Sequence, residues 1–159
     1  MTQNDINAPG EDGHTPLHWA CGQGHIALAR LLLEHGADVN VREGRNNRTG
    51  LHLACLEGHT DTARLLLEHR AEVNARDRVG CAPLHLACMG GGHPDIVRLL
   101  LEHGADITTR DGRDHTPLHL AMKLPPDNPA REELLDLFRE YAPELVMEAY
   151  CSPGPGGGR

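Results

Sequence analysis

The chain has 159 residues, the length of one domain, and a formal net charge of −8, which disfavours general attraction to nucleic acid or anionic lipid. No run of 18 apolar residues occurs, and the N-terminus lacks the basic and apolar regions of a secretory signal, so we expect neither a membrane span nor secretion. The five cysteines form an odd set without a short-range pairing pattern, which favours reduced thiols and a cytoplasmic location.

One seven-residue phrase occurs four times at a nearly constant interval. It reads HTPLHWA at 14–20, RTGLHLA at 48–54, CAPLHLA at 81–87 and HTPLHLA at 115–121, with steps of 34, 33 and 34 residues. A leucine-rich second phrase keeps the same step, at 31–40, 65–74 and 99–107. A period of this size means that one unit cannot bury its own apolar face, so neighbouring units must stack into a solenoid.

The elements expected within a unit follow from its turn and helix signals. Each unit opens with a finger loop, and Gly13, Asn47, Gly80 and Asp114 occupy equivalent tip positions as residue types that tolerate a positive φ. A first helix then begins at a threonine cap or a proline, and a short Gly-His turn leads to a second helix. The second helix carries an apolar stripe, which in the first unit includes Leu28.

The second helices end at a position that favours glycine. Gly36 and Gly104 occupy it in the first and third units, where a left-handed residue closes the helix. In the second unit Arg70 stands there instead, at a cost of about 1 kcal/mol. Gly50 likewise replaces the proline that begins the first helix in the other units, which is a further small local loss.

The boundaries of the chain follow from its irregular ends. We expect a repeat domain over 5–141, with four units that start near 9, 42, 76 and 110. In the fourth unit Asn128 caps a helix over 129–141 with a polar face, typical of a capping unit. A short helical extension is expected over 142–150 and a disordered Pro/Gly tail over 151–159.

Both repeated phrases resemble the ankyrin repeat, whose pattern includes Thr-Pro-Leu-His-x-Ala early and Leu-Leu-x-x-Gly-Ala-Asp-x-Asn late. The resemblance covers roughly 5–141 and implies an all-α solenoid of stacked helix–turn–helix units joined by β-hairpin fingers. It also implies a protein that binds other proteins. We expect a monomer without a cofactor.

Three His-x-x-Cys pairs offer ligand types that zinc prefers, namely His18 with Cys21, His52 with Cys55 and His85 with Cys88. Equivalent residues of successive units lie about 8–10 Å apart, too far for a disulfide or a four-ligand zinc site. We therefore interpret the histidines as structural and these cysteines as small buried residues, whereas Cys81, in a finger, is expected to be accessible. No phosphate loop, zinc-protease motif or nucleophile elbow occurs, so we predict no enzyme.

Candidate binding residues are those at which the units differ, because the shared positions hold the fold. Seven of the fourteen arginines fall in three fingers. They are Arg42, Arg45 and Arg48; Arg76 and Arg78; and Arg110 and Arg113. The adjacent ends of the first helices contribute Gln23, Leu56, Glu57, Met89 and Lys123.

The leading hypothesis is a non-catalytic module that binds an acidic segment of a protein partner on the concave surface of fingers and first helices, with arginine favoured for carboxylate contacts. The arginines could equally serve only to keep the exposed hairpins soluble. Two alternatives remain open: nucleic-acid binding through the same arginines, and a metal- or redox-responsive protein that uses the Cys/His set. The acidity and the lack of interleaved aromatics disfavour nucleic acid.

Overall fold

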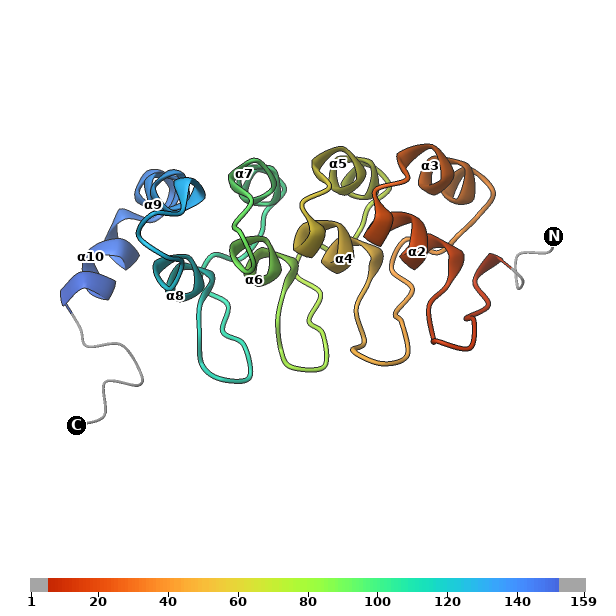
Figure 1. Ribbon diagram of the computed structural model, residues 1–159, viewed down its shortest axis with the longest axis horizontal. Helices are drawn as coiled ribbons and strands as arrows, with labels where there is room; N and C mark the ends of the chain where they lie inside the picture. The colour runs from red at the N-terminus through yellow and green to blue at the C-terminus, as the bar shows by residue number, and fades with distance from the viewer. Residues whose placement is uncertain (1–5, 152–159) are drawn as a thin grey trace.

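The computed structural model describes residues 6–151, so residue 5 and residues 152–159 of the tail expected over 151–159 lie outside the described part. Cys151, expected in that tail, instead ends a helix. Figure 1 shows a row of helix pairs with finger loops on one side. The helices are α2 (Pro16–Gln23), α3 (Ile26–Glu34), α4 (Gly50–Glu57), α5 (Thr60–Glu68), α6 (Pro83–Cys88), α7 (Pro94–Glu102), α8 (Pro117–Met122), α9 (Pro129–Tyr141) and α10 (Pro143–Cys151). The solenoid expected from the repeat period is confirmed.

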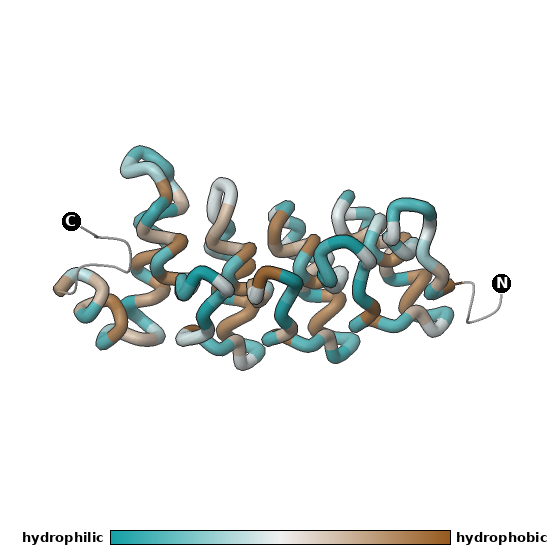
Figure 2. The backbone as a smooth tube through the Cα atoms, turned by 90° about the horizontal axis from the view of Figure 1, so that it is seen from below, coloured by the Kyte–Doolittle hydropathy of each residue, from teal (hydrophilic) through white to brown (hydrophobic). Residues whose placement is uncertain are grey.

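The helices form two layers. The first helices α2, α4, α6 and α8 stack in one layer beside the fingers, and the second helices α3, α5, α7 and α9 stack behind them (Figure 1). α10 packs against α9 at the far end of the row. Seen from the side of the fingers, the loops are mostly hydrophilic, whereas the helices carry hydrophobic stretches (Figure 2).

The first helices begin at reciprocal hydrogen bonds between threonine and histidine. Thr49 Oγ1 accepts from the backbone N–H of His52 at 3.4 Å, and His52 Nδ1 accepts from the backbone N–H of Thr49 at 3.1 Å. The first and fourth units repeat this arrangement. Ala82 has no hydroxyl for this purpose, yet its N–H still donates to His85 Nδ1 at 3.1 Å. The histidine thus maintains half of the cap where threonine is missing.

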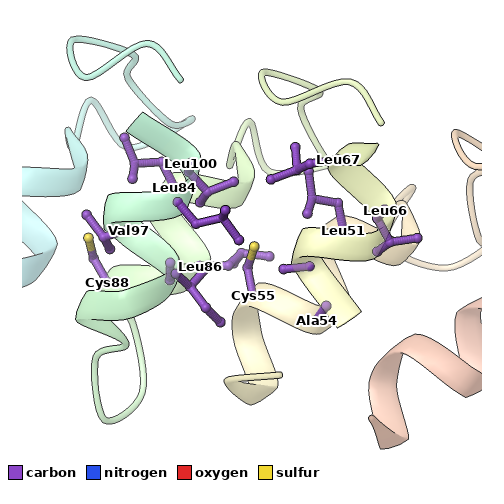
Figure 3. Packing of buried hydrophobic residues seen from close by; sticks show 14 of the residues in the cluster. Leu51, Ala54, Cys55, Leu66, Leu67, Leu84, Leu86, Cys88, Val97 and Leu100 are labelled. Carbon is purple, nitrogen blue, oxygen red and sulfur yellow. The ribbon is translucent and has the colours of Figure 1, made fainter. Parts of the chain in front are cut away.

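The core lies between the units rather than inside any one of them. Figure 3 shows Cys55 of the second unit facing Leu84 and Leu86 of the third, all fully or almost fully buried. The first unit has no helix pair before it within the described residues. Leu28, expected in the buried stripe, is consequently 41% exposed, whereas the equivalent Ile96 is fully buried.

Hydrogen bonds also connect neighbouring units. Asn40 Oδ1 accepts from the backbone N–H of Glu72 at 2.8 Å. The histidine of a Gly-His turn binds back to the preceding unit, where His59 Nε2 lies 3.1 Å from the carbonyl oxygen of Gly22. In the fourth unit Asn128 does the same with Gly91 while it caps α9 as expected. One residue thus replaces a missing histidine and starts a helix.

The fingers are hairpin turns without a β-strand in any of the described residues, a refinement of the expected β-hairpins. In place of the hydrogen bonds of a strand ladder, a carboxylate inside each loop accepts hydrogen bonds from backbone N–H groups of the same loop. In the third finger the backbone N–H of Asp77 donates to the carbonyl of Cys81 at 2.9 Å, and Asp77 Oδ1 accepts from the N–H of Val79 at 3.0 Å. Adjacent tips are linked, because the N–H of Gly112 donates to the carbonyl of Val79 at 2.8 Å.

The predicted left-handed residues are confirmed. φ is +82° at Gly80 and +57° at Asn47, and it is +65° at Arg70, which ends α5 without the help of glycine. The expectation that Cys81 is accessible is wrong, because this residue is only 5% exposed. It stands at the base of a short finger, where its carbonyl lies 3.0 Å from His52 Nε2 of the preceding unit. No helix in the described part of the chain is long and apolar enough to cross a membrane.

Candidate partner-binding surface

The surface combines finger loops with the exposed ends of the first helices. Of the finger arginines, Arg48 is half-buried and the other six are exposed. At the helix ends Gln23, Glu57, Met89 and Lys123 are exposed and Leu56 is half-buried. The carbonyl of Leu56 accepts from His93 of the next unit, so part of this residue serves the stack.

Three of the arginines are tied to the next finger. Arg42 Nη1 donates to the carbonyl of Arg76 at 2.6 Å, and Arg76 Nη2 donates to Thr109 Oγ1 at 2.8 Å. Arg48 Nε donates to Asp77 Oδ2 at 3.1 Å, and the Asp77 side chain is fully buried. These side chains hold neighbouring fingers together.

The remaining finger arginines differ in how they are engaged. Arg110 pairs with Asp114 of its own finger at 3.1 Å. The ion pairs and side-chain hydrogen bonds of residues 6–151 include none from the guanidinium groups of Arg45, Arg78 or Arg113. These three arginines are therefore the ones with side chains ready for an external acceptor.

A groove of about 300 Å³ lies between the third and fourth fingers and the helices behind them. Its lining residues are Val79, Cys81, Met89, Asp111, Arg113, His115, Leu120 and Lys123. Val79 is 59% exposed at the finger tip, and Lys123 Nζ lies 3.0 Å from His115 Nε2. The groove thus combines apolar side chains with two cations, and its one carboxylate, Asp111, is engaged by His115 at 3.7 Å and by backbone N–H groups of its own finger. This combination suits an apolar side chain flanked by carboxylates.

A second pocket of about 440 Å³ lies at the other end of the row, between the first and second units. Its lining residues are Asp12, His14, His18, Trp19, Gly22, Gln23, Leu53, Glu57 and His59. The candidate binding residues at the helix ends therefore lie in two separate pockets. Gln23 and Glu57 line this pocket, whereas Met89 and Lys123 line the groove of the third and fourth units.

Sequence reasoning missed Trp19, Val79 and Leu120 as surface residues. The signal was present for Trp19, because it replaces the leucine found at the same place in the other three units. It was also present for Val79, an apolar residue at the tip of an otherwise polar loop. Leu120 gave no such signal, since its equivalent Leu86 is fully buried.

The histidines and cysteines of the three His-x-x-Cys pairs are buried in the interior. Burial lowers the pKa of His52 to about 4 and raises the pKa of Cys21 to about 12. Burial also raises the pKa of Cys55 and Cys88. Within residues 6–151 no group of three or more His, Cys, Asp or Glu side chains is placed to hold a metal ion. Protonated buried thiols suit packing better than redox chemistry.

Comparison with known families agrees with the repeat architecture. A family model described as ankyrin repeats in three copies matches residues 2–77, and a single ankyrin-repeat model matches residues 79–112. The chain belongs to the ankyrin-repeat family. Ankyrin repeats are protein–protein interaction modules, so a protein partner is the general expectation for this chain.

Similarity to individual proteins is confined to short segments. The chain is 57% identical to the mouse serine/threonine-protein kinase TNNI3K over 37 residues, which is 23% of this chain and 4% of the kinase. It is 45% identical to human scaffold protein ILK over 40 residues, 25% of this chain and 9% of that protein. It is 52% identical to the fission yeast palmitoyltransferase akr1 over 40 residues, 25% of this chain and 6% of the transferase. The matches span less than a tenth of these relatives.

Proposed function

We propose that the chain is a non-catalytic protein-binding module that recognises an acidic segment of one partner through its second to fourth fingers. The observation that carries this proposal is the state of Arg45, Arg78 and Arg113. All three are exposed on finger loops, and none has a side-chain partner among the described residues. The fold has therefore no evident use for their charges, although the chain as a whole is acidic.

The groove beside these arginines supports a mixed acidic and apolar ligand. Val79 and Met89 offer apolar surface next to Arg113 and Lys123. Carboxylates of the partner would meet guanidinium groups bidentately, while an apolar side chain covers Val79. Such charge contacts act mostly on association rate and specificity, and they weaken as salt screens them over about 8–10 Å.

The proposed setting is the cytoplasm, with the chain acting as a monomer. The cysteines of the described residues are all free thiols, which supports a reducing compartment. The relatives matched over single repeats include a protein named as a scaffold, which supports a binding role without naming the partner of this chain.

The test begins with capture of partners on the immobilised chain and identification by mass spectrometry. Each captured protein is then divided into peptides, and their affinities are measured by surface plasmon resonance at low and high salt. We expect an acidic peptide to bind and the triple change Arg45→Glu, Arg78→Glu and Arg113→Glu to abolish its binding. The melting temperature should stay nearly the same, because exposed unpaired charges contribute little to stability.

A matched control moves the same charge change to the second helices. Arg30→Glu with Arg64→Glu alters two exposed arginines of α3 and α5, away from the fingers, and should leave binding intact. The proposal is wrong if the finger variant binds the acidic peptide as tightly as the parent does. A captured ligand that proves to be nucleic acid, with a steep salt dependence, would overturn it in favour of the alternative.

A further inference from the structure

The pocket between the first and second units contains the one tryptophan of the chain. Trp19 is 55% exposed on α2, and its ring stacks on His25 with an interplanar angle of 17° and centroids 6.1 Å apart. Trp19 lines the pocket, whereas His25 does not, so the indole borders the pocket while the imidazole lies outside it. The other units place Leu53, Leu86 and Leu120 here, so the stack does not require an aromatic residue.

A glycine keeps the pocket open. Gly22 lies within α2, and a Cβ atom added to it would meet no atom within 4 Å. The second unit has Leu56 at the equivalent position, where the leucine side chain is half-buried. Glycine in a helix costs up to about 1 kcal/mol relative to alanine, so this residue is not explained by helix formation. Its effect is to leave room beside Trp19.

The charged groups at this pocket are carboxylates. Glu57 ends α4 on an exposed surface, and the ion pairs of residues 6–151 do not include it. Asp12 is also exposed, with Oδ2 3.4 Å from His14 Nδ1. No lysine or arginine lines the pocket. Of the histidines that line the pocket, His59 lies with Nε2 3.1 Å from the carbonyl oxygen of Gly22, which occupies this nitrogen.

We propose that this pocket binds an arginine side chain of the protein partner, with the guanidinium plane on Trp19 and its donors directed to Glu57. An aromatic face next to carboxylates is the environment that a planar cation with several donors fits best. An uncharged or acidic ligand would leave Glu57 without a counter-charge and gain nothing from the indole quadrupole.

The proposal extends the proposed function, on which it rests only in taking the ligand to be a protein segment. The arginine site lies two units from the groove of the third and fourth units, a separation of about 20 Å at roughly 10 Å per unit. An extended chain covers that distance in about six residues at 3.3 Å each. The partner segment should thus carry an arginine about six residues from its acidic part.

The experiment uses the full chain and three capped tripeptides, Ac-Gly-Arg-Gly-NH2, the citrulline analogue and the lysine analogue, at pH 7.5. Because Trp19 is the one tryptophan, its fluorescence and its indole N–H signal report on this site alone. We expect saturable shifts with the arginine peptide. Citrulline keeps the shape of arginine without its charge and should bind about tenfold more weakly, as should lysine, which lacks the planar face.

Two variants and two matched controls localise the site. Gly22→Leu fills the pocket with the residue that the second unit has, and Glu57→Gln removes the counter-charge; each should weaken arginine binding about tenfold. Gly91→Leu adds a leucine at another glycine with open space, and Glu34→Gln removes an exposed carboxylate of α3; both should bind like the parent. Circular dichroism should show the same helix content in all four.

Equal binding of the arginine and citrulline peptides would overturn the proposal, and so would unchanged affinity in Gly22→Leu. A lysine peptide that binds as tightly as the arginine peptide would overturn the assignment to arginine. None of these results depends on the acidic peptide or on the finger arginines. Failure here therefore leaves the proposed function standing, and failure of the finger variants leaves the arginine site standing.

Discussion

Arg48 of the second finger donates from Nε to Oδ2 of Asp77 in the third finger, 3.1 Å away and 29 positions along the chain. The Asp77 side chain is fully buried, and its other oxygen accepts from the backbone N–H groups of Val79 and Cys81. Asp77 therefore shapes one finger and anchors the finger before it. Arg48 is for this reason a structural residue of the fingers rather than a free contact for a partner.

The first prediction concerns this pair. Arg48→Ala should destabilise the chain by about 2 kcal/mol, because it leaves a buried carboxylate without its counter-charge. Urea unfolding followed by circular dichroism measures the change. Arg45→Ala, an exposed arginine of the same finger, is the control and should shift stability by less than about 0.5 kcal/mol. Equal effects of the two changes would show that the ion pair contributes nothing.

The left-handed arginine predicts a stabilising change. Arg70 has φ +65°, where a Cβ atom is strained, and Arg70→Gly should raise the free energy of unfolding by about 1 kcal/mol. The reverse change Gly104→Arg at φ +86° should lower it by a similar amount, since no atom lies within 4 Å of the added Cβ and only the backbone is strained. A lower denaturant midpoint for Arg70→Gly would contradict this account.

Gly50 and Cys21 should be energetically coupled. A Cβ at Gly50 would lie 2.8 Å from Cys21 Sγ, so Gly50→Pro alone should give no gain although proline starts the equivalent helices. With Cys21→Ala present, the same proline should stabilise the chain. A double-mutant cycle in urea measures the coupling, which we expect to be about 1 kcal/mol or more. Additive single changes would mean that the sulfur moves aside without cost.

Native thiol labelling should distinguish one cysteine from four. Cys151 is exposed at the end of α10, whereas Cys21, Cys55, Cys81 and Cys88 are buried. Burial also raises the pKa of Cys81 to about 11, which reduces its reactive thiolate. Intact-mass analysis should show one fast modification, which Cys151→Ser removes, and four more only in denaturant. Fast labelling at Cys81 would contradict its buried position.

Stability should fall as the pH falls from 7 towards 4. Burial lowers the pKa of His52 from its ordinary value near 6.5 to about 4, and burial lowers the pKa of His18 and His85 too. Between pH 6.5 and pH 4 the unfolded chain binds more protons than the folded chain. The free energy of unfolding therefore falls with pH, by up to about 3 kcal/mol from His52 alone. Urea midpoints at pH 8, 7, 6 and 5 measure this, with little change above pH 7.5. A midpoint that stays constant down to pH 5 would contradict it.

The sequence by itself determined the solenoid, the order of elements and most helix starts and ends. These depend on local patterns that recur along the chain, such as the threonine three residues before His52 and His119 and the left-handed residue after α5. These patterns can be identified from sequence because each one forms its hydrogen bonds with residues at most four positions away. The placement of exposed arginines on the fingers followed from the same register.

The tertiary structure alone decided which side chains are free on the surface and which are engaged by a neighbouring unit. Arg48 and Arg45 look alike in sequence, yet one is held by Asp77 of another unit and the other is free. Cys81 lies in a finger but is buried, with its carbonyl oxygen 3.0 Å from His52 Nε2. Gly50 looks replaceable until the position of Cys21 is known. The pocket beside Trp19 likewise exists only where two units meet. Such features depend on side chains that stacking brings together from about thirty residues apart, a distance at which sequence periodicity specifies the neighbours but not their contacts.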